Sequence, residues 1–386
     1  MLIIVAMNAF KGCMGSIAAG ESVARGLRKA APQADIRVMG LADGGDGTLD
    51  VARQLMPGAE AIKEETLNAL LEPVCSHWLY DRDSRTAFLE MARSAGLALL
   101  AGRRDVMHSS SYGFGMQIGQ AIDAGARHLV IGLGGSATND AGLGAMQALG
   151  LRVRLRSEGW ISRPVAGGDL TEVEQLDASL LRKRIEGIRV TALFDAHIPL
   201  CGPMGAARLY SPQKGADPDM VDCLEKGLRN VEEIIRRCGA LTPGDAAQGA
   251  GAAGGAGLAC RCLLGAEMQA GAGYLLELQG LPRIAAIARG IITGEGASDA
   301  QTLQGKGPET VRRMAPDGVP VCLLSGRIDD TQMLLDAGFS RVIDINQEAP
   351  DPEVNPLFAE VAGRRLEAAA LKLMKQGAFG TDRDIF

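Results

Sequence analysis

Short apolar runs alternate with helix-spaced apolar positions at both ends of the chain. The runs at 2–6 and 36–41 predict strands, and the apolar residues that follow each of them at helical spacing predict helices. Near the C-terminus, the runs at 291–293, 319–324 and 342–345 predict further strands with helices between and after them. Strands that alternate with helices in this way are typical of a parallel sheet.

The middle of the chain has a different pattern. Two strand-like segments, 74–80 and 85–90, flank the turn-forming residues 81–84 and predict an antiparallel hairpin. Residues 151–155 alternate strictly between apolar and charged side chains, as in a half-exposed strand, and 221–235 carries a helical apolar stripe. The change from parallel to mixed character and back predicts a second domain inserted into the first.

We therefore expect an α/β fold with two domains, which also suits a chain of 386 residues. The parallel-sheet domain is predicted to be discontinuous, with residues 1–65 and 276–386, and the mixed α/β insertion to span 66–275. Clefts between domains are common sites for small ligands, so we expect the active site between the two.

Composition excludes several classes of protein. The net charge of −6, the lack of a long Lys/Arg run and the aromatic content of 4% argue against a nucleic-acid partner. The sequence contains no run of about 18 apolar residues, so no membrane span is predicted. The N-terminus lacks the basic flank of a signal peptide. The eight cysteines are scattered and form no metal-binding spacing, which predicts reduced thiols in a cytoplasmic protein.

The most informative motif is Gly-Leu-Gly-Gly-Ser-Ala-Thr-Asn-Asp at 132–140, between a predicted strand and a predicted helix. Such a turn leaves several backbone N–H groups aimed at one spot, which suits a phosphate. Ser136, Thr138 and Asn139 add side-chain donors, and Asn139 or Asp140 could cap the helix. The alternative is a well-capped glycine turn without a ligand.

Three further glycine-rich loops favour a ligand. They lie at 42–48, 249–255 and 293–299, and two of them, like the loop at 132–140, carry carboxylates among the glycines. A carboxylate repels a phosphate unless a cation lies between them, and Mg²⁺ takes oxygen ligands from one or two carboxylates and from phosphates. Glycines, hydroxyls and carboxylates together indicate a metal–nucleotide site.

Other charged residues are predicted at strand ends, where α/β folds bind ligands. Lys11 follows the first strand, Asp195 follows the strand pattern at 190–194, and Lys214 stands beside a glycine. No P-loop motif is present. Residues 132–137 also fit the G-x-G-x-x-A dinucleotide pattern, but the next strand, 151–155, does not end in an acidic residue, so an NAD-dependent dehydrogenase is the weaker alternative.

Taken in order, these blocks resemble the type-I bacterial glycerate kinases. The matching residues are Phe10-Lys11-Gly12, 42–48, 132–140, Gly202-Pro203 with 212–216, 249–255, and 293–296 with Asp299, Gln301, Thr302, Gly305 and Lys306. The resemblance covers residues 2 to about 330. It implies a Rossmann-like domain with an inserted second domain. It also implies ATP- and Mg²⁺-dependent phosphorylation of D-glycerate, at the 2-hydroxyl, giving 2-phosphoglycerate and ADP.

Four positions depart from that family pattern. Asn8 stands where the family has an aspartate, Ile198 replaces an asparagine and Ala297 a basic residue, while Asp46 replaces a glutamate. These changes leave two alternatives open, a kinase of a related small hydroxy acid and a non-catalytic protein that binds a nucleotide or an acid. The sequence does not fix the oligomeric state, and a homodimer is one alternative.

The resulting hypothesis gives each candidate residue a role. The nucleotide phosphates are expected to bind the backbone N–H groups of Gly134, Gly135, Ser136 and Ala137, helped by the side chains of Ser136 and Asn139. Asp195 is expected to be the general base and Asp43 to bind Mg²⁺, with the roles interchangeable, so both are candidate metal ligands. The residues expected to contact the acid substrate are Lys11, Glu295, Asp299 and Thr302.

Overall fold

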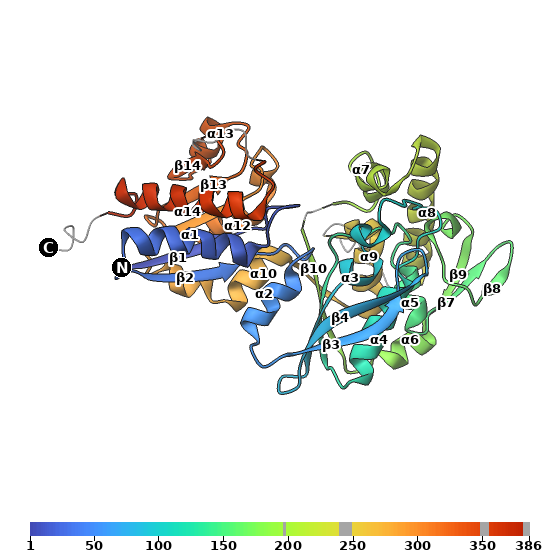
Figure 1. Cartoon of the computed structure of the whole chain (residues 1–386). Coiled ribbons are helices and arrows are strands. Elements are labelled where there is room, and N and C mark those ends of the chain that lie inside the picture. The colour runs from blue at the N-terminus through green and yellow to red at the C-terminus, as the bar shows by residue number, and fades with distance from the viewer. Residues whose placement is uncertain (196–197, 239–248, 348–354, 381–386) are drawn as a thin grey trace. The chain divides into compact units, whose positions relative to one another are not determined.

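The computed structural model describes residues 1–195, 198–238, 249–347 and 355–380 (Figure 1). The chain forms two compact units. The first comprises Met1–Asp43, Asp50–Leu55 and Ala272–Phe386, and the second comprises Gly44–Leu49 and Met56–Gly271. A parallel sheet in one unit and a mixed sheet in the other confirm the predicted fold class.

The sheet of the first unit is parallel throughout, in the order β14-β13-β12-β1-β2. Its strands are β1 (Leu2–Met7), β2 (Asp35–Gly40), β12 (Gly290–Glu295), β13 (Val321–Ser325) and β14 (Arg341–Asp344). Its helices are α1 (Ser16–Ala30), α10 (Gly271–Leu278), α11 (Leu281–Ala285), α12 (Gly307–Met314), α13 (Thr331–Asp336) and α14 (Ala359–Lys375); α2 (Thr48–Leu55) begins in the segment assigned to the second unit.

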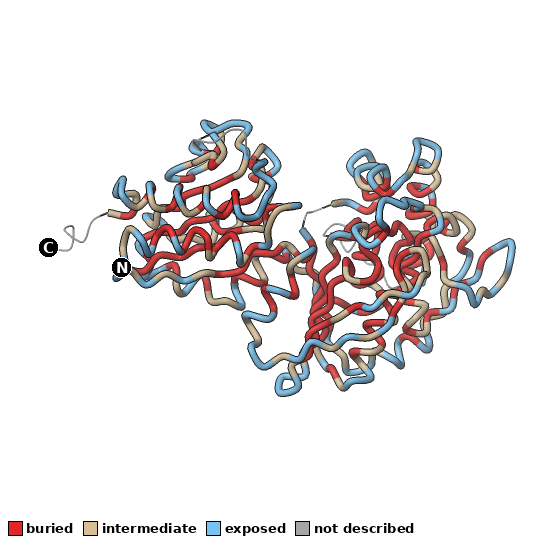
Figure 2. The backbone as a smooth tube through the Cα atoms, viewed as in Figure 1, coloured by how far each residue is buried: buried red, intermediate tan, exposed pale blue. Residues whose placement is uncertain are grey.

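Strand β1 is covered on both faces of the sheet, which accounts for its apolar sequence. All six of its residues are buried (Figure 2). Ile3, Val5 and Met7 face a core that includes α1 and α14, whereas Ile4 and Ala6 face the opposite core. A strand that is covered on both faces has no polar side, so it appears as a continuous apolar run. Helices α1 and α14 lie side by side (Figure 1), and a Cβ at Gly26 would clash with the backbone of Glu367.

The second unit has a mixed sheet in the order β11-β10-β6-β5-β4-β3. The four strands β5 (Thr86–Glu90), β6 (His128–Gly132), β10 (Arg189–Phe194) and β11 (Glu267–Ala270) are parallel, and β3 (Glu60–Leu67) and β4 (Pro73–Asp81) add an antiparallel edge. The hairpin formed by β4 and β5 is the one predicted. Strand β3 was not predicted; it lies in the longer segment of the second unit, which begins at Met56.

A small antiparallel sheet, β8-β7-β9, completes the second unit. It contains β7 (Arg152–Leu155), β8 (Gly159–Ile161) and β9 (Val173–Asp177). The helices are α3 (Ala92–Ala95), α4 (Tyr112–Asp123), α5 (Leu143–Ala148), α6 (Ser179–Arg184), α7 (Ala206–Tyr210), α8 (Pro218–Arg237) and α9 (Ala252–Leu264). Because β7 joins this separate sheet, the next strand after the glycine loop is not the parallel strand that a dinucleotide-binding βαβ unit requires.

No helix in the described part of the chain is both long enough and apolar enough to cross a bilayer. The placement of the active site between the two domains remains a prediction.

Candidate functional site

Two glycine loops of the second unit pack backbone against backbone. The N–H of Gly134, in the loop after β6, donates to the carbonyl of Gly44 at 2.9 Å. A Cβ at Gly134 would lie 2.4 Å from the Cα of Gly45, and one at Gly132 would lie 2.4 Å from the oxygen of Gly44. Only glycine permits so close an approach. The loops at 132–140 and 44–47 thus form one structure, which we call the paired glycine loops.

The exposed tip of the paired glycine loops combines amide donors with a carboxylate. Gly135 is exposed, and a Cβ there would lie 3.5 and 3.6 Å from the two carboxylate oxygens of Asp46. The N–H groups of Gly134 and Ala137 donate to the carbonyls of Gly44 and Ala95. Among the described residues, nothing accepts a hydrogen bond from the N–H of Gly135 or Ser136. Two of the four amides predicted to bind phosphate are therefore engaged in holding the loop, and two remain at its tip.

Lys214 is buried next to this tip. It ends a short 3₁₀ helix (Pro212–Lys214), is 3% exposed, and donates from Nζ to the carbonyl of Thr138 at 2.7 Å and to Oγ of Ser136 at 3.0 Å. Burial lowers the pKa of this ammonium group to about 8, and the charge of Asp140 opposes the shift. The sequence showed only that Lys214 stands beside a glycine; the fold brings it to the loop.

Asp140, rather than Asn139, holds the backbone at the start of α5. Its buried carboxylate accepts hydrogen bonds from the N–H groups of Gly142 and Gly144, and from the N–H and hydroxyl of Ser111. Burial raises the pKa of the Asp140 carboxyl, against the effect of these bonds. Asp140 therefore stabilises the backbone of the loop.

Asn139 was predicted to contact the nucleotide, and the structure places its side chain in the interior. Neither the oxygen nor the nitrogen of its amide has a hydrogen-bond partner among the described residues, and the residue is fully buried. It packs against the third glycine loop, where a Cβ at Gly254 would lie 2.6 Å from the Cα of Asn139. The carbonyl of Gly254 accepts from the N–H of Ala141.

That third loop opens α9 with an unusual backbone. Ala253, Gly254 and Gly255 have φ values of 53°, 66° and 94°, in the left-handed region. Ala141, directly opposite, also has a positive φ of 56°. Positive φ is costly for residues with a Cβ and persists where the surroundings enforce it, often at functional sites.

Glu90 supports the other glycine loop. It ends β5, is almost fully buried, and accepts hydrogen bonds from the N–H of Leu49 at 2.6 Å and from Nε of Arg93 at 2.8 Å. Burial raises the pKa of the Glu90 carboxyl, and Asp46 adds to the shift. Sequence reasoning missed Glu90, whose signal was a carboxylate at the end of a predicted strand.

Asp195 follows β10, as predicted, and its side chain is exposed. Burial raises the pKa of the Tyr210 hydroxyl, and the charge of Asp195 adds to that shift, so α7 lies within the range of its field. The next two residues, 196 and 197, lie outside the described part of the chain.

In the first unit, a buried hydroxyl–carboxylate cluster lies at the carboxyl end of the sheet. Glu295 ends β12, and its Oε1 accepts hydrogen bonds from Thr302 at 2.6 Å and from Ser298 at 3.1 Å. The hydroxyls of Ser298 and Ser325 are 2.6 Å apart. Burial raises the pKa of the Glu295 carboxyl, against the hydrogen bonds and the charge of Lys306. Two predicted substrate-binding residues, Glu295 and Thr302, are therefore joined directly.

The loop that carries Lys11 lies next to the same cluster. A Cβ at Gly296 would lie 3.6 Å from the backbone nitrogen of Lys11, whose side chain is exposed. Asp299 accepts a hydrogen bond from the N–H of Gln301 and thereby forms the turn before Thr302. Asp43 follows β2 at the same carboxyl end and is half-buried.

Asn8, which departs from the family pattern, uses its side-chain oxygen locally. It accepts a hydrogen bond from the N–H of Ala9 at 2.8 Å. An aspartate could accept the same bond, so the amide keeps the turn after β1 while removing a charge at the end of the sheet.

The predicted site residues thus form two groups. Those of the first unit are Lys11, Asp43, Glu295, Asp299 and Thr302; those of the second are Gly134, Gly135, Ser136, Ala137, Asn139 and Asp195. Asp43 and Asp195 belong to different units, and their sharing of a metal ion remains a prediction. Among the described residues, no cluster of three or more His, Cys, Asp or Glu side chains could hold a metal. A nucleotide-bound Mg²⁺ needs only one or two carboxylates, and Asp46 supplies one at the tip.

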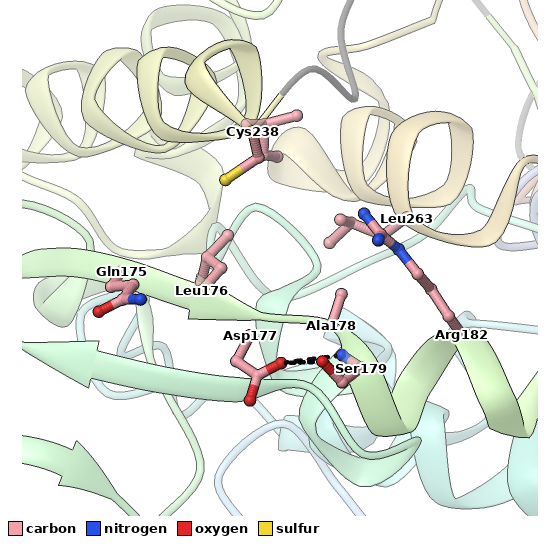
Figure 3. Close-up of a pocket in the computed structure, with 9 residues that line it drawn as sticks. Gln175, Leu176, Asp177, Ala178, Ser179, Arg182, Cys238 and Leu263 are labelled. Carbon is pink, nitrogen blue, oxygen red and sulfur yellow. Dashed lines mark hydrogen bonds between the residues drawn. The ribbon is translucent and has the colours of Figure 1, made fainter.

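A hollow of about 240 Å³ in the second unit has a different lining (Figure 3). It contains none of the predicted site residues. Asp177 there accepts hydrogen bonds from the N–H and hydroxyl of Ser179, which lower the pKa of the Asp177 carboxyl and start α6. Because it holds none of the predicted site residues, this hollow is not the candidate active site.

Comparison with known proteins shows similarity over nearly the whole chain. The family model described as the glycerate kinase family matches residues 3–376. The glycerate kinase of Bacillus subtilis (strain 168) is 36% identical over 97% of the chain and 99% of its own length, and the glycerate 2-kinase of Escherichia coli (strain K12) is 34% identical over 89% and 90%. A crystal structure from Salmonella typhimurium LT2, of a protein provisionally named glycerate kinase 2, matches with a TM-score of 0.82 and 31% identity over 98% of the chain and 99% of that protein.

Proposed function

The chain belongs to the glycerate kinase family, and from that premise we propose that it transfers the γ-phosphoryl group of ATP to the 2-hydroxyl of D-glycerate, giving 2-phosphoglycerate and ADP. The observation that carries this proposal is the tip of the paired glycine loops. There, Gly135 lies beside the carboxylate of Asp46, and neither its N–H nor that of Ser136 donates to a described residue. Unpaired amides attract phosphate oxygens, and a neighbouring carboxylate suits the accompanying cation.

In this proposal the second unit binds the nucleotide. The N–H groups of Gly135 and Ser136 donate to phosphate oxygens, and Asp46 joins Asp43 and Asp195 as a candidate oxygen ligand for the metal. Mg²⁺, when bound, neutralises phosphate charge and orients the transferring group. The side chain of Asn139 is buried, so in this proposal Asn139 does not bind the nucleotide but stabilises the loop by packing against the backbone of Gly254.

The first unit binds the acid. Lys11 is an exposed cation at the carboxyl end of a parallel sheet, and it would pair with the substrate carboxylate or the transferring phosphoryl group. Glu295, held by Thr302 and Ser298, and Asp299, which shapes the same loop, would fix the substrate hydroxyls. Asp195 would accept the proton of the attacking hydroxyl.

A coupled assay with ATP, Mg²⁺ and D-glycerate tests the proposal. We expect ADP release that depends on glycerate, with 2-phosphoglycerate identified by ³¹P NMR. L-Glycerate, glycolate and lactate serve as comparison substrates, and a faster reaction with one of them would reassign the acid. Turnover no faster than in buffer, in protein shown to be folded by circular dichroism, would remove the kinase proposal. Binding of ATP or glycerate without any product would instead favour a sensor.

A further inference from the structure

Lys214 is a buried cation with no ion pair to any described residue. The hydrogen-bond partners of its Nζ are neutral, the carbonyl of Thr138 and Oγ of Ser136. Asp140 is the charged group whose field acts on it, but that carboxylate already accepts four hydrogen bonds from Ser111, Gly142 and Gly144. A buried, unpaired charge is unfavourable in a folded protein unless something compensates for it. A bound anion at the neighbouring tip would supply the missing negative charge.

The bond between Lys214 and Ser136 makes the serine hydroxyl an acceptor toward the lysine. An ammonium group can only donate, so Oγ of Ser136 must be the acceptor. The hydrogen of the Ser136 hydroxyl is then directed elsewhere, and no described residue accepts it. Ser136 is 7% exposed, at the same tip as the two remaining amides. Its hydroxyl is therefore prepared to donate to a ligand.

We propose that Lys214 is a positioning residue for the phosphates of the nucleotide. It holds the loop through the carbonyl of Thr138, turns the hydroxyl of Ser136 toward the phosphates, and carries the positive charge that the bound anion balances. This inference rests on the proposed function, because it takes the nucleotide to lie at the tip of the paired glycine loops. No step of the transfer is assigned to the lysine.

A bound anion should also change the protonation of Lys214. Without a bound anion, burial lowers the pKa of the Lys214 ammonium group to about 8. At pH 8.5, Lys214 is therefore neutral in a large share of the molecules. An anion that settles nearby favours the charged form and raises the pKa. Binding of the nucleotide at pH 8.5 must then take up protons, in an amount of roughly half a proton or more per site.

Isothermal titration calorimetry with ADP and Mg²⁺, at pH 8.5 in two buffers of different ionisation enthalpy, measures this uptake directly. We expect proton uptake in the wild type. Lys214→Met should bind ADP roughly 10- to 100-fold more weakly, because a charge-assisted interaction is lost. Its binding of ADP should take up no protons. Lys183→Met, which removes an exposed lysine of α6 in the same unit, should match the wild type.

Ser136→Ala provides a second variant if Lys214→Met fails to fold. It keeps the cation, so it should lose affinity several-fold while retaining the proton uptake. Wild-type affinity and uptake in Lys214→Met would overturn the inference, as would a wild type that binds neither ADP nor inorganic tripolyphosphate. The titration contains no acid substrate, so ADP binding with the expected uptake but no turnover of glycerate would refute the proposed reaction alone.

Discussion

Asp140 binds Ser111 twice, through the backbone N–H and through the hydroxyl, each at 2.7 Å. Ser111 immediately precedes α4, and its Oγ also accepts a hydrogen bond from the N–H of Ala145 in α5. The carboxylate that ends the glycine loop thereby joins the beginnings of two helices. Because these bonds are buried, each donor depends on the one carboxylate for its partner.

Replacing Asp140 with Asn should destabilise the protein. Oδ2 accepts three of the four hydrogen bonds and Oδ1 the fourth. Asparagine has one oxygen for these two positions, so its NH₂ group faces at least one buried donor whichever way the amide lies. We expect the free energy of unfolding in urea to fall by about 2–4 kcal/mol, the cost of leaving buried donors unpaired. Asp123→Asn, on the surface beside Arg184, is the control and should leave it almost unchanged. Wild-type stability of Asp140→Asn would contradict the network.

Replacing Gly134 with Ala should separate the paired glycine loops. The new Cβ would lie 2.4 Å from the Cα of Gly45, which is backbone and cannot move aside easily. We expect a loss of about 1–3 kcal/mol in unfolding free energy, together with weaker nucleotide binding. Gly58→Ala, with nothing within 4 Å of the added carbon, is the matched control. If both variants keep normal stability and affinity, the close packing of the two loops is unimportant.

The sequence was most informative where burial is uniform along an element. Strand β1 is buried on both faces and was evident. Strand β3, with Glu60, Lys63 and Glu65 exposed, has no apolar run and is recognisable only through its pairing with β4. Pattern and resemblance located the glycine loops and Glu295. Lys214 contacts the loop residue Ser136 from 78 residues away, and Glu90 contacts Leu49, just after the other loop, from 41 residues away. Such contacts are visible only in the folded structure.

The buried carboxyl of Glu295 should make stability depend on pH. Its pKa in the folded protein is above the ordinary 4.5, chiefly because of burial. As pH rises through 4.5, the unfolded chain releases this proton before the folded one, so the contribution of Glu295 to stability falls and stays low above its folded pKa. Glu295→Gln lacks this effect. Between pH 4 and 7, the free energy of unfolding of Glu295→Gln in urea should therefore rise relative to that of the wild type. A difference between the two proteins that stays constant with pH would contradict the assignment.

Kinetics of Asp195→Asn and Asp43→Asn should separate the base from the metal ligand. Loss of a general base lowers kcat by roughly 10²–10⁴-fold, and excess metal cannot restore it. Loss of a metal ligand instead raises the Mg²⁺ concentration needed for half-maximal rate, and excess Mg²⁺ recovers part of the activity. We expect the first behaviour for Asp195 and the second for Asp43, measured as turnover across a Mg²⁺ titration with Asp123→Asn as control. The reverse pattern would exchange the two roles, and an unchanged rate in either variant would remove that aspartate from the site.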